Sequence, residues 1–137
     1  MERKEFKTEW CLLQNQFDSY EKNSLYIKLL SIIVLLAVEI SDAISIVIVL
    51  VLVVLWLQDA IWKTFQSRIE PRLLRIEKYI SEESDESAFQ FNSEYHSVHL
   101  SGLSLINEYV RQSIRPTVAF PHIVLILILL IRYFGSE

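Results

Sequence analysis

The sequence AISIVIVLVLVVLWLQ, residues 43–58, lies between Asp42 and Asp59 and carries no charged side chain. A strand rich in isoleucine and valine normally ends within about ten residues. A helix that is apolar on every face needs lipid or a large protein core around it, and a chain of 137 residues cannot supply such a core. The stretch therefore predicts a helix that crosses a membrane.

Two more stretches are apolar in the same way. No charged residue occurs between Lys28 and Glu39, and residues 116–131 contain His122 as their only ionisable side chain. A membrane helix needs about 20 apolar residues, whereas buried helices of soluble proteins show runs of roughly 10–14. The lengths of the three stretches fall between these two values. Since a chain this small has no core for them, we expect three bilayer spans, at residues 25–40, 43–62 and 118–134.

The first two spans form separate helices. As one helix, residues 25–57 would extend about 50 Å, whereas the hydrocarbon core of a bilayer is about 30 Å thick. Glu39 and Asp42 supply a polar break between them. The predicted fold is an all-α membrane protein with a transmembrane helical hairpin over 25–62, a third transmembrane helix over 118–134, and amphipathic cytoplasmic helices.

Lysine and arginine residues indicate the orientation in the membrane. Residues 1–24 carry four of them and residues 63–117 carry seven, whereas the turn of the hairpin carries none. We therefore expect these two segments to be cytoplasmic, and the hairpin turn and the C-terminus to lie outside.

Residues 1–24 predict an amphipathic helix, because large apolar side chains recur three or four positions apart at Phe6, Trp10, Leu13, Phe17 and Tyr20. The charges of this segment nearly cancel, which favours packing against another helix over lying on anionic lipid. A matching apolar stripe follows the second span, at Trp62, Phe65, Ile69, Leu73, Ile76 and Ile80. Within that stripe we expect a kink or a new helix start at Pro71.

The rest of segment 63–117 is less regular. Residues 81–87, SEESDES, have four acidic side chains and no apolar one, which is typical of a loop. We expect residues 89–95 to form a short extended piece. A second amphipathic helix is indicated by the spacing of Leu103, Ile106, Val110 and Ile114. Pro116 suits the first turn of the third span, and Pro121 is expected to bend it.

Sequence motifs for catalysis are lacking. The two glycines lie far apart, so they form no phosphate-binding loop, and Cys11 is the only cysteine. We expect neither an enzyme nor a cofactor. Glu94, His96 and His99 are spaced so that they can share a helix face and hold zinc, although surface histidines beside a loop are the more common case. His122 either senses protons near the membrane surface or simply forms a hydrogen bond there.

Five polar or charged side chains lie in or at the edges of the hairpin: Lys28, Ser31, Ser45, Gln58 and Asp59. Ionisable groups inside a membrane usually face the protein interior or a water-filled path, so these residues are candidates for lining a pore. Each can also reach a membrane surface, and Asp59 has Lys63 one helical turn away.

Basic side chains are frequent after the second span, and three of them are candidates for binding a cytoplasmic protein partner: Arg68, Arg72 and Arg75. The same stretch, RIEPRLLRIEK, also allows a phosphate or nucleotide site. We favour the simpler interpretation, a solvated polar face on a packed helix, and we expect no nucleic-acid partner.

Three groups of residues carry a resemblance to known proteins: Asn23, Ser24 and Lys28, then Trp56, Leu57, Asp59 and Ala60, then Arg68, Glu70 and Arg72. Over roughly the first 80 residues the chain resembles a set of small three-span bacterial inner-membrane proteins of uncharacterised function. The resemblance implies a location in the bacterial inner membrane. Some members of the set look like effector or accessory components of defence loci, which implies a role in antiphage defence.

Two functions follow as hypotheses. In the first, subunits form a homo-oligomer whose spans form a pore or perturb the membrane in response to a cytoplasmic trigger. Short spans favour self-association, because oligomerisation is one response to hydrophobic mismatch. In the second, the protein is a membrane anchor or regulatory subunit whose cytoplasmic helices recruit a soluble protein.

Overall fold

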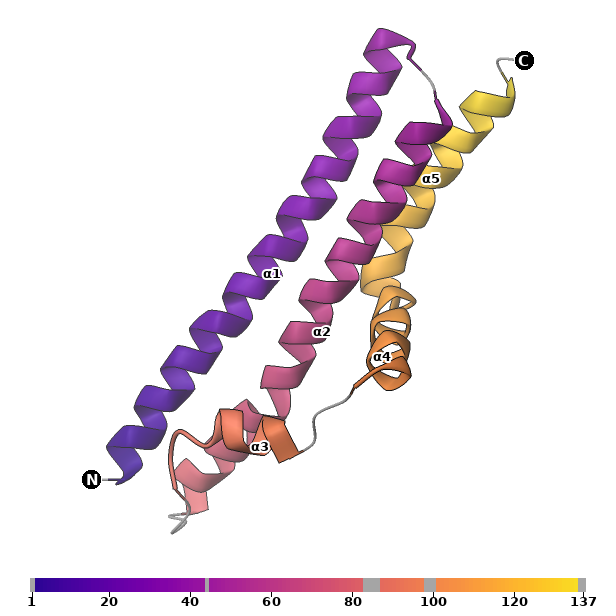
Figure 1. Ribbon diagram of the computed structural model, residues 1–137. Coiled ribbons are helices and arrows are strands. Elements are labelled where there is room, and N and C mark those ends of the chain that lie inside the picture. The colour runs from indigo at the N-terminus through magenta and orange to yellow at the C-terminus, as the bar shows by residue number, and fades with distance from the viewer. Residues whose placement is uncertain (1, 44, 83–86, 98–100, 136–137) are drawn as a thin grey trace.

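The computed structural model describes residues 2–43, 45–82, 87–97 and 101–135, and within those ranges the regular structure consists of helices alone (Figure 1). Three helices are long: α1 (Glu2–Ser41), α2 (Ile46–Glu82) and α5 (Pro116–Gly135). Two are short: α3 (Phe91–Ser97) and α4 (Leu103–Ser113). The predicted all-α class is therefore confirmed.

Helices α1 and α2 form the predicted antiparallel hairpin (Figure 1). Helix α1 ends at Ser41, and Asp42 follows with a φ of 50°, a left-handed conformation that aspartate tolerates better than most residues. The backbone N–H of Val47 then donates to the hydroxyl of Ser45 at 3.3 Å as α2 begins. The polar residues between the first two spans thus act as a helix stop and a helix start.

Helix α5 packs beside the half of α2 nearest to the hairpin turn, and it also contacts α1 (Figure 1). The three helices share an apolar core formed by Leu35, Val38, Val49, Leu52 and Leu129. At the end of α5, Arg132 lies 3.2 Å from Asp42 and 3.4 Å from Glu39. The third span therefore ends at the same level as the hairpin turn, as expected for three crossings of one bilayer.

Helices α1, α2 and α5 each contain a segment long and apolar enough to cross a membrane. Their outward faces carry many exposed leucine, isoleucine and valine side chains, among them Ile33, Leu36, Val47, Leu50, Val54, Leu127 and Ile131. Water would hydrate such a surface poorly, whereas lipid suits it. The bundle is thus compatible with a location in a membrane.

The other half of the hairpin joins residues 2–24 to the apolar stripe of α2. The rings of Phe6 and Tyr79 lie 5.6 Å apart, and those of Tyr20 and Trp62 lie 5.5 Å apart. The expectation that this segment packs on another helix is confirmed. The structure adds that residues 2–24 and the first span form one uninterrupted helix.

Helix α2 continues through Pro71, so of the two alternatives expected there a new helix start is excluded. One local expectation was wrong. Residues 89–95 are not extended, because α3 covers residues 91–97. The N–H of Glu94 donates to the carbonyl of Gln90 at 2.9 Å, and Phe91 stacks on Tyr95 one turn away, with ring centroids 6.3 Å apart. This local aromatic pair suits a helical turn. Apolar and polar residues alternate only weakly in the segment, so a strand would not gain a regular apolar face.

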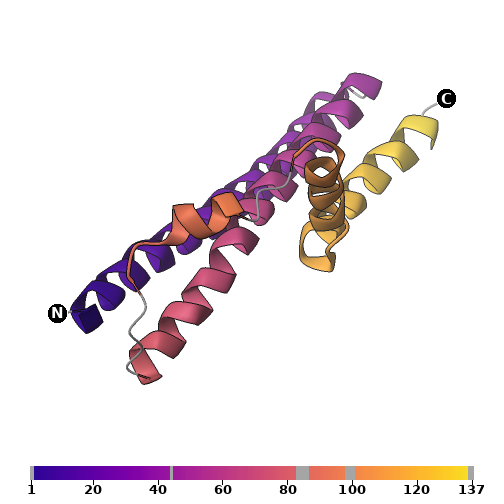
Figure 2. The same cartoon turned by 60° about the horizontal axis from the view of Figure 1, so that its bottom comes forward.

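Helix α4 confirms the second amphipathic helix, but it is oriented with its apolar face outward. The side chains of Leu103, Ile106, Val110 and Ile114 are exposed, whereas Gln112 and Ser113 are buried against the bundle. Figure 2 shows α4 lying next to the start of α5, which begins at Pro116 as predicted. Within the expected acidic loop, residues 83–86 lie outside the described residues.

Candidate functional site

Asp59 of α2 lies at the centre of a group of polar side chains that we call the membrane charge cluster: Ser24, Lys28, Asp59 and His122. Lys28 is half-buried and the other three are buried. No part of the Asp59 side chain is exposed. One carboxylate oxygen, Oδ1, accepts a hydrogen bond from Ser24. The other, Oδ2, lies 3.3 Å from the Lys28 ammonium and 3.2 Å from Nε2 of His122. The cluster therefore connects all three membrane-compatible helices.

Helical periodicity explains how α1 supplies two of these groups. Ser24 and Lys28 are four residues apart and share one face of α1. The Lys28 ammonium also donates to the Ser24 hydroxyl at 2.8 Å, so both point at Asp59. Beside them on α2, the indole N–H of Trp56 donates to the backbone carbonyl of Ser113 at 3.0 Å, which ties the start of the third span to the same level.

His122 is the contribution of α5 to the cluster. A carboxylate can only accept hydrogen bonds, so Nε2 of His122 carries the proton shared with Asp59. Nδ1 is buried and has no hydrogen-bond partner among the described residues. The ammonium of Lys28 and the carboxylate of Asp59 balance each other in charge. The cluster thus holds a neutralised ion pair covered by a histidine.

The structure brings together only two of the five polar residues singled out in the hairpin, Lys28 and Asp59. Ser31 is buried but donates to the carbonyl of Ile27 in its own helix at 2.9 Å. Ser45 lies at the hairpin turn, and Gln58 is half-buried outside the cluster.

The partner expected for Asp59 was wrong. Lys63 instead forms an ion pair with Glu21 of α1 and donates to Gln66 at 3.0 Å. Lys28 likewise turns inward to Asp59 rather than out to the membrane surface. Interactions between helices take precedence over the helical neighbour in both cases.

A second polar site lies in the half of the hairpin away from its turn and is built around Arg72 of α2. Only 3% of its side chain is exposed. Its Nε and Nη2 donate to the two carboxylate oxygens of Glu9 at 2.9 and 3.0 Å, a bidentate pair. Burial alone would lower the pKa of Arg72, but the hydrogen bond and charge of Glu9 outweigh it and raise the pKa. Glu9 also accepts the backbone N–H of Phe89 at 2.6 Å.

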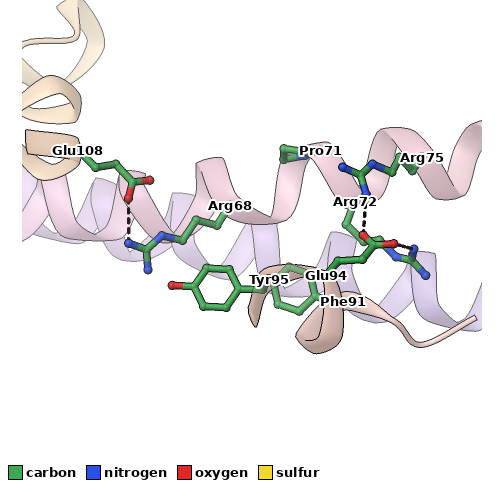
Figure 3. Close-up of a pocket in the computed structure, with 8 residues that line it drawn as sticks. All are labelled: Arg68, Pro71, Arg72, Arg75, Phe91, Glu94, Tyr95 and Glu108. Atoms are coloured by element: carbon green, nitrogen blue, oxygen red, sulfur yellow. Dashed lines mark hydrogen bonds and ion pairs between the residues drawn. The ribbon is translucent and has the colours of Figure 1, made fainter. Parts of the chain in front are cut away.

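Beside this pair lies a cleft with a volume of about 270 Å³, which we call the arginine cleft. It is lined by Arg68, Pro71, Arg72, Arg75, Phe91, Glu94, Tyr95 and Glu108 (Figure 3). Glu94 lies between two guanidinium groups, with one oxygen 2.5 Å from Nη1 of Arg72 and the other 2.9 Å from Nη1 of Arg75. Figure 3 shows Phe91 and Tyr95 side by side along α3.

Arg68 forms the end of the cleft nearest to the membrane bundle. It donates to Glu108 of α4 at 3.0 Å, and its guanidinium lies 5.4 Å from the ring of Tyr95. Burial lowers the pKa of Arg68, but the hydrogen bond and charge of Glu108 more than offset this and raise it. The arginine is therefore permanently charged and held against an aromatic wall.

The three arginines predicted as partner-binding residues thus line one cleft, but they differ in access. Arg75 has 53% of its side chain exposed, whereas Arg72 is buried by its contacts with Glu9 and Glu94. We expected these arginines to form a solvated polar face on a packed helix. This holds only in part for Arg75, because its guanidinium is bound to Glu94. Arg72 does not present a free surface to a protein partner.

The possible zinc site does not assemble in the part of the chain that the structure describes. Glu94 is bound to Arg72 and Arg75. His99 lies outside the described residues. Within the described residues no group of three potential metal ligands is found.

The pore-lining prediction omitted two members of the membrane charge cluster, Ser24 and His122. The hydrogen bond expected of His122 is present, with Asp59 as its partner. Signals for both were present: Ser24 is one turn from Lys28, and His122 is the only ionisable residue of its apolar run.

Comparison with known proteins adds no relative: no family model, no curated protein and no solved structure matches the chain.

Proposed function

We propose that the protein is a membrane effector that forms a homo-oligomer and opens a polar path through the bacterial inner membrane in response to a cytoplasmic trigger, in the context of antiphage defence. The observation that supports this most is the contact of buried Asp59 and His122 with half-buried Lys28 among three membrane-compatible helices. Ionisable groups are expensive in a membrane and usually mark a path for ions or protons.

In this proposal the described conformation is closed. Lys28 and Asp59 belong to the α1–α2 hairpin, and α5 contacts Asp59 through His122. Moving α5 away from the hairpin would give water access to the Asp59 carboxylate and to the Lys28 ammonium and Ser24 hydroxyl that bind it. Helix α5 is attached to the hairpin by the hydrogen bond between His122 and Asp59, which is lost when α5 moves.

The cytoplasmic helices provide a route to this movement. Helix α4 precedes α5 directly and is bonded to α2 through the Arg68–Glu108 ion pair. Its outward apolar stripe also supports self-association, because four large apolar side chains lie exposed on one face: Leu103, Ile106, Val110 and Ile114. Contacts between copies at this face would act on the start of α5.

Expression in bacterial cells with a potential-sensitive dye tests the proposal. We expect expression of the chain to depolarise the membrane. A hydrogen bond to a charged group contributes about 1.5–3 kcal/mol, so His122→Leu should shift the opening equilibrium by about ten- to a hundredfold and depolarise cells at correspondingly lower expression. The control is Phe120→Leu, because Phe120 is exposed on the same helix. A membrane potential that stays intact on expression of the chain would contradict the proposal.

The second candidate is a membrane anchor or regulatory subunit that recruits a soluble protein. The exposed half of Arg75, at the edge of the arginine cleft, favours this function. The same measurement separates the two candidates, because an anchor leaves the membrane potential unchanged. Catalysis forms no part of either proposal.

A further inference from the structure

Glu94 occupies the arginine cleft in the manner of a bound anion. Its two carboxylate oxygens face two different guanidinium groups, those of Arg72 and Arg75 (Figure 3). Arginine binds carboxylate and phosphate with the same planar arrangement of N–H groups. The position of Glu94 is therefore also a position for a phosphate group.

The attachment of Glu94 is weak enough for a ligand to replace it. Helix α3 has seven residues, and each keeps part of its surface exposed. A helix of this length is not stable by itself in water, so its contacts with α2 hold it in place. The side chain of Glu94 is 32% exposed. Arg72 does not depend on Glu94 for neutralisation, because Glu9 already pairs with it at both carboxylate oxygens.

The remaining walls of the cleft suit a flat apolar group. Phe91, Tyr95 and Pro71 provide apolar surface, and the stacked rings of Phe91 and Tyr95 lie next to Glu94 (Figure 3). Glu108 pairs with Arg68 and Glu9 with Arg72, so displacement of Glu94 leaves one uncompensated positive charge in the cleft, that of Arg75. A volume of about 270 Å³ is slightly below the range of typical small-ligand pockets, about 300–1,000 Å³. The ligand is accordingly small.

The cleft lies away from the expected membrane surface. Arg75 follows Trp62, the last residue of the second span, by 13 residues, which corresponds to about 20 Å along the helix. Lipid phosphates at the surface of the bilayer are too near to the span to reach this position. A soluble ligand fits the location better than a lipid headgroup.

From these observations we infer that the arginine cleft binds a small soluble organic phosphate with an aromatic ring. The phosphate group replaces Glu94 between Arg72 and Arg75, and the ring lies against Phe91 and Tyr95. In the ligand-free protein Glu94 competes for the same two guanidinium groups. This site does not depend on the proposed opening of the membrane helices.

Phenyl phosphate is a suitable probe, titrated by calorimetry into the full-length protein in nanodiscs of zwitterionic lipid. We expect the unmodified protein to bind it. Glu94→Gln removes the competing carboxylate and should bind about tenfold more tightly, whereas Arg75→Gln should bind about tenfold more weakly. The matched control is Lys78→Gln, which removes one positive charge from the same helix outside the cleft and should leave the affinity unchanged.

Three results would overturn the inference. The first is an absence of binding by both the unmodified protein and Glu94→Gln. The second is equal affinity of Arg75→Gln and Lys78→Gln, a comparison that remains valid even if Glu94→Gln releases α3. The third is equal affinity for inorganic phosphate and phenyl phosphate, which would remove the role of the aromatic wall.

Nanodiscs that contain phosphatidylglycerol distinguish a soluble ligand from a lipid headgroup. A soluble ligand requires that phenyl phosphate binds equally well in zwitterionic and anionic nanodiscs. Loss of binding in the anionic nanodiscs alone would show that lipid occupies the cleft and would overturn the assignment of a soluble ligand.

Discussion

Among the described residues, Arg72 and Glu9 form the most deeply buried ion pair in the half of the hairpin away from its turn, with 3% of each side chain exposed. Removing one partner of such a pair leaves the other charge buried without compensation, which costs about 3–5 kcal/mol. Arg72→Gln should therefore lower the stability of the protein by about this amount. The decrease is measurable as a lower Tm of the detergent-solubilised protein.

The double variant Glu9→Gln with Arg72→Gln removes both charges and should recover part of the loss. Arg75→Gln is the matched control, because Arg75 is more than half exposed and such surface pairs contribute about 0–1 kcal/mol. Equal effects of Arg72→Gln and Arg75→Gln would show that burial of the Arg72–Glu9 pair has no energetic consequence.

Single residues also show how far the sequence predicts the site. Lys28 and Asp59 could be recognised because a charge in an apolar stretch is conspicuous. Their contact with each other could not, because it depends on how α1 and α2 are aligned, and helical spacing favoured Lys63 as the partner of Asp59. The partner of Lys63 is Glu21, 42 positions away in the sequence.

At the scale of helices, most elements could be predicted from apolar periodicity. The hairpin, the third span and the packing of residues 2–24 on α2 follow from where charges are absent and where large side chains recur. Helix α3 could not be predicted, since it is held by contacts with another helix, those of Glu94 with Arg72 and Arg75 and that of Tyr95 with Arg68. The orientation of α4 was also not predictable, because Glu108 and Gln112 bind α2 through Arg68 and Ser67.

The ion pair between Glu21 and Lys63 connects α1 to α2 just beyond the expected membrane surface and gives a pH-dependent contribution to stability. The hydrogen bond from Lys63 lowers the pKa of Glu21. The stabilisation is therefore present above the ordinary pKa of glutamate, about 4.3, and is lost as the pH falls through the lowered pKa of the folded protein. Because Glu21 is more than half exposed, the ion pair stabilises the folded protein by at most about 1 kcal/mol.

Glu21→Gln should accordingly lower the Tm at neutral pH, and the difference from the unmodified protein should vanish in acid. Glu5→Gln is the control, because Glu5 is an exposed carboxylate of the same helix. A Tm difference for Glu21→Gln that stays constant from neutral pH into acid would contradict the assigned role of the ion pair.

At the scale of the whole molecule, α1 and α2 run without interruption through two chemically different halves. One half presents apolar side chains outward and buries the membrane charge cluster, and the other half is held by the Arg72–Glu9 pair and aromatic contacts. The distribution of lysine and arginine residues predicts that the second half is cytoplasmic. On this arrangement, the membrane charge cluster lies at the boundary between the two halves.

The most direct test of this arrangement is labelling with a membrane-impermeant maleimide in bacterial spheroplasts. Cys11 is exposed and is the natural cysteine of the chain, and Ala43 is exposed at the hairpin turn. We predict that Cys11 is labelled only after the membrane is permeabilised, whereas Ala43→Cys in a Cys11→Ser background is labelled in intact spheroplasts. Equal labelling of both positions in intact spheroplasts, or recovery of the protein in the soluble fraction, would contradict the membrane-spanning arrangement.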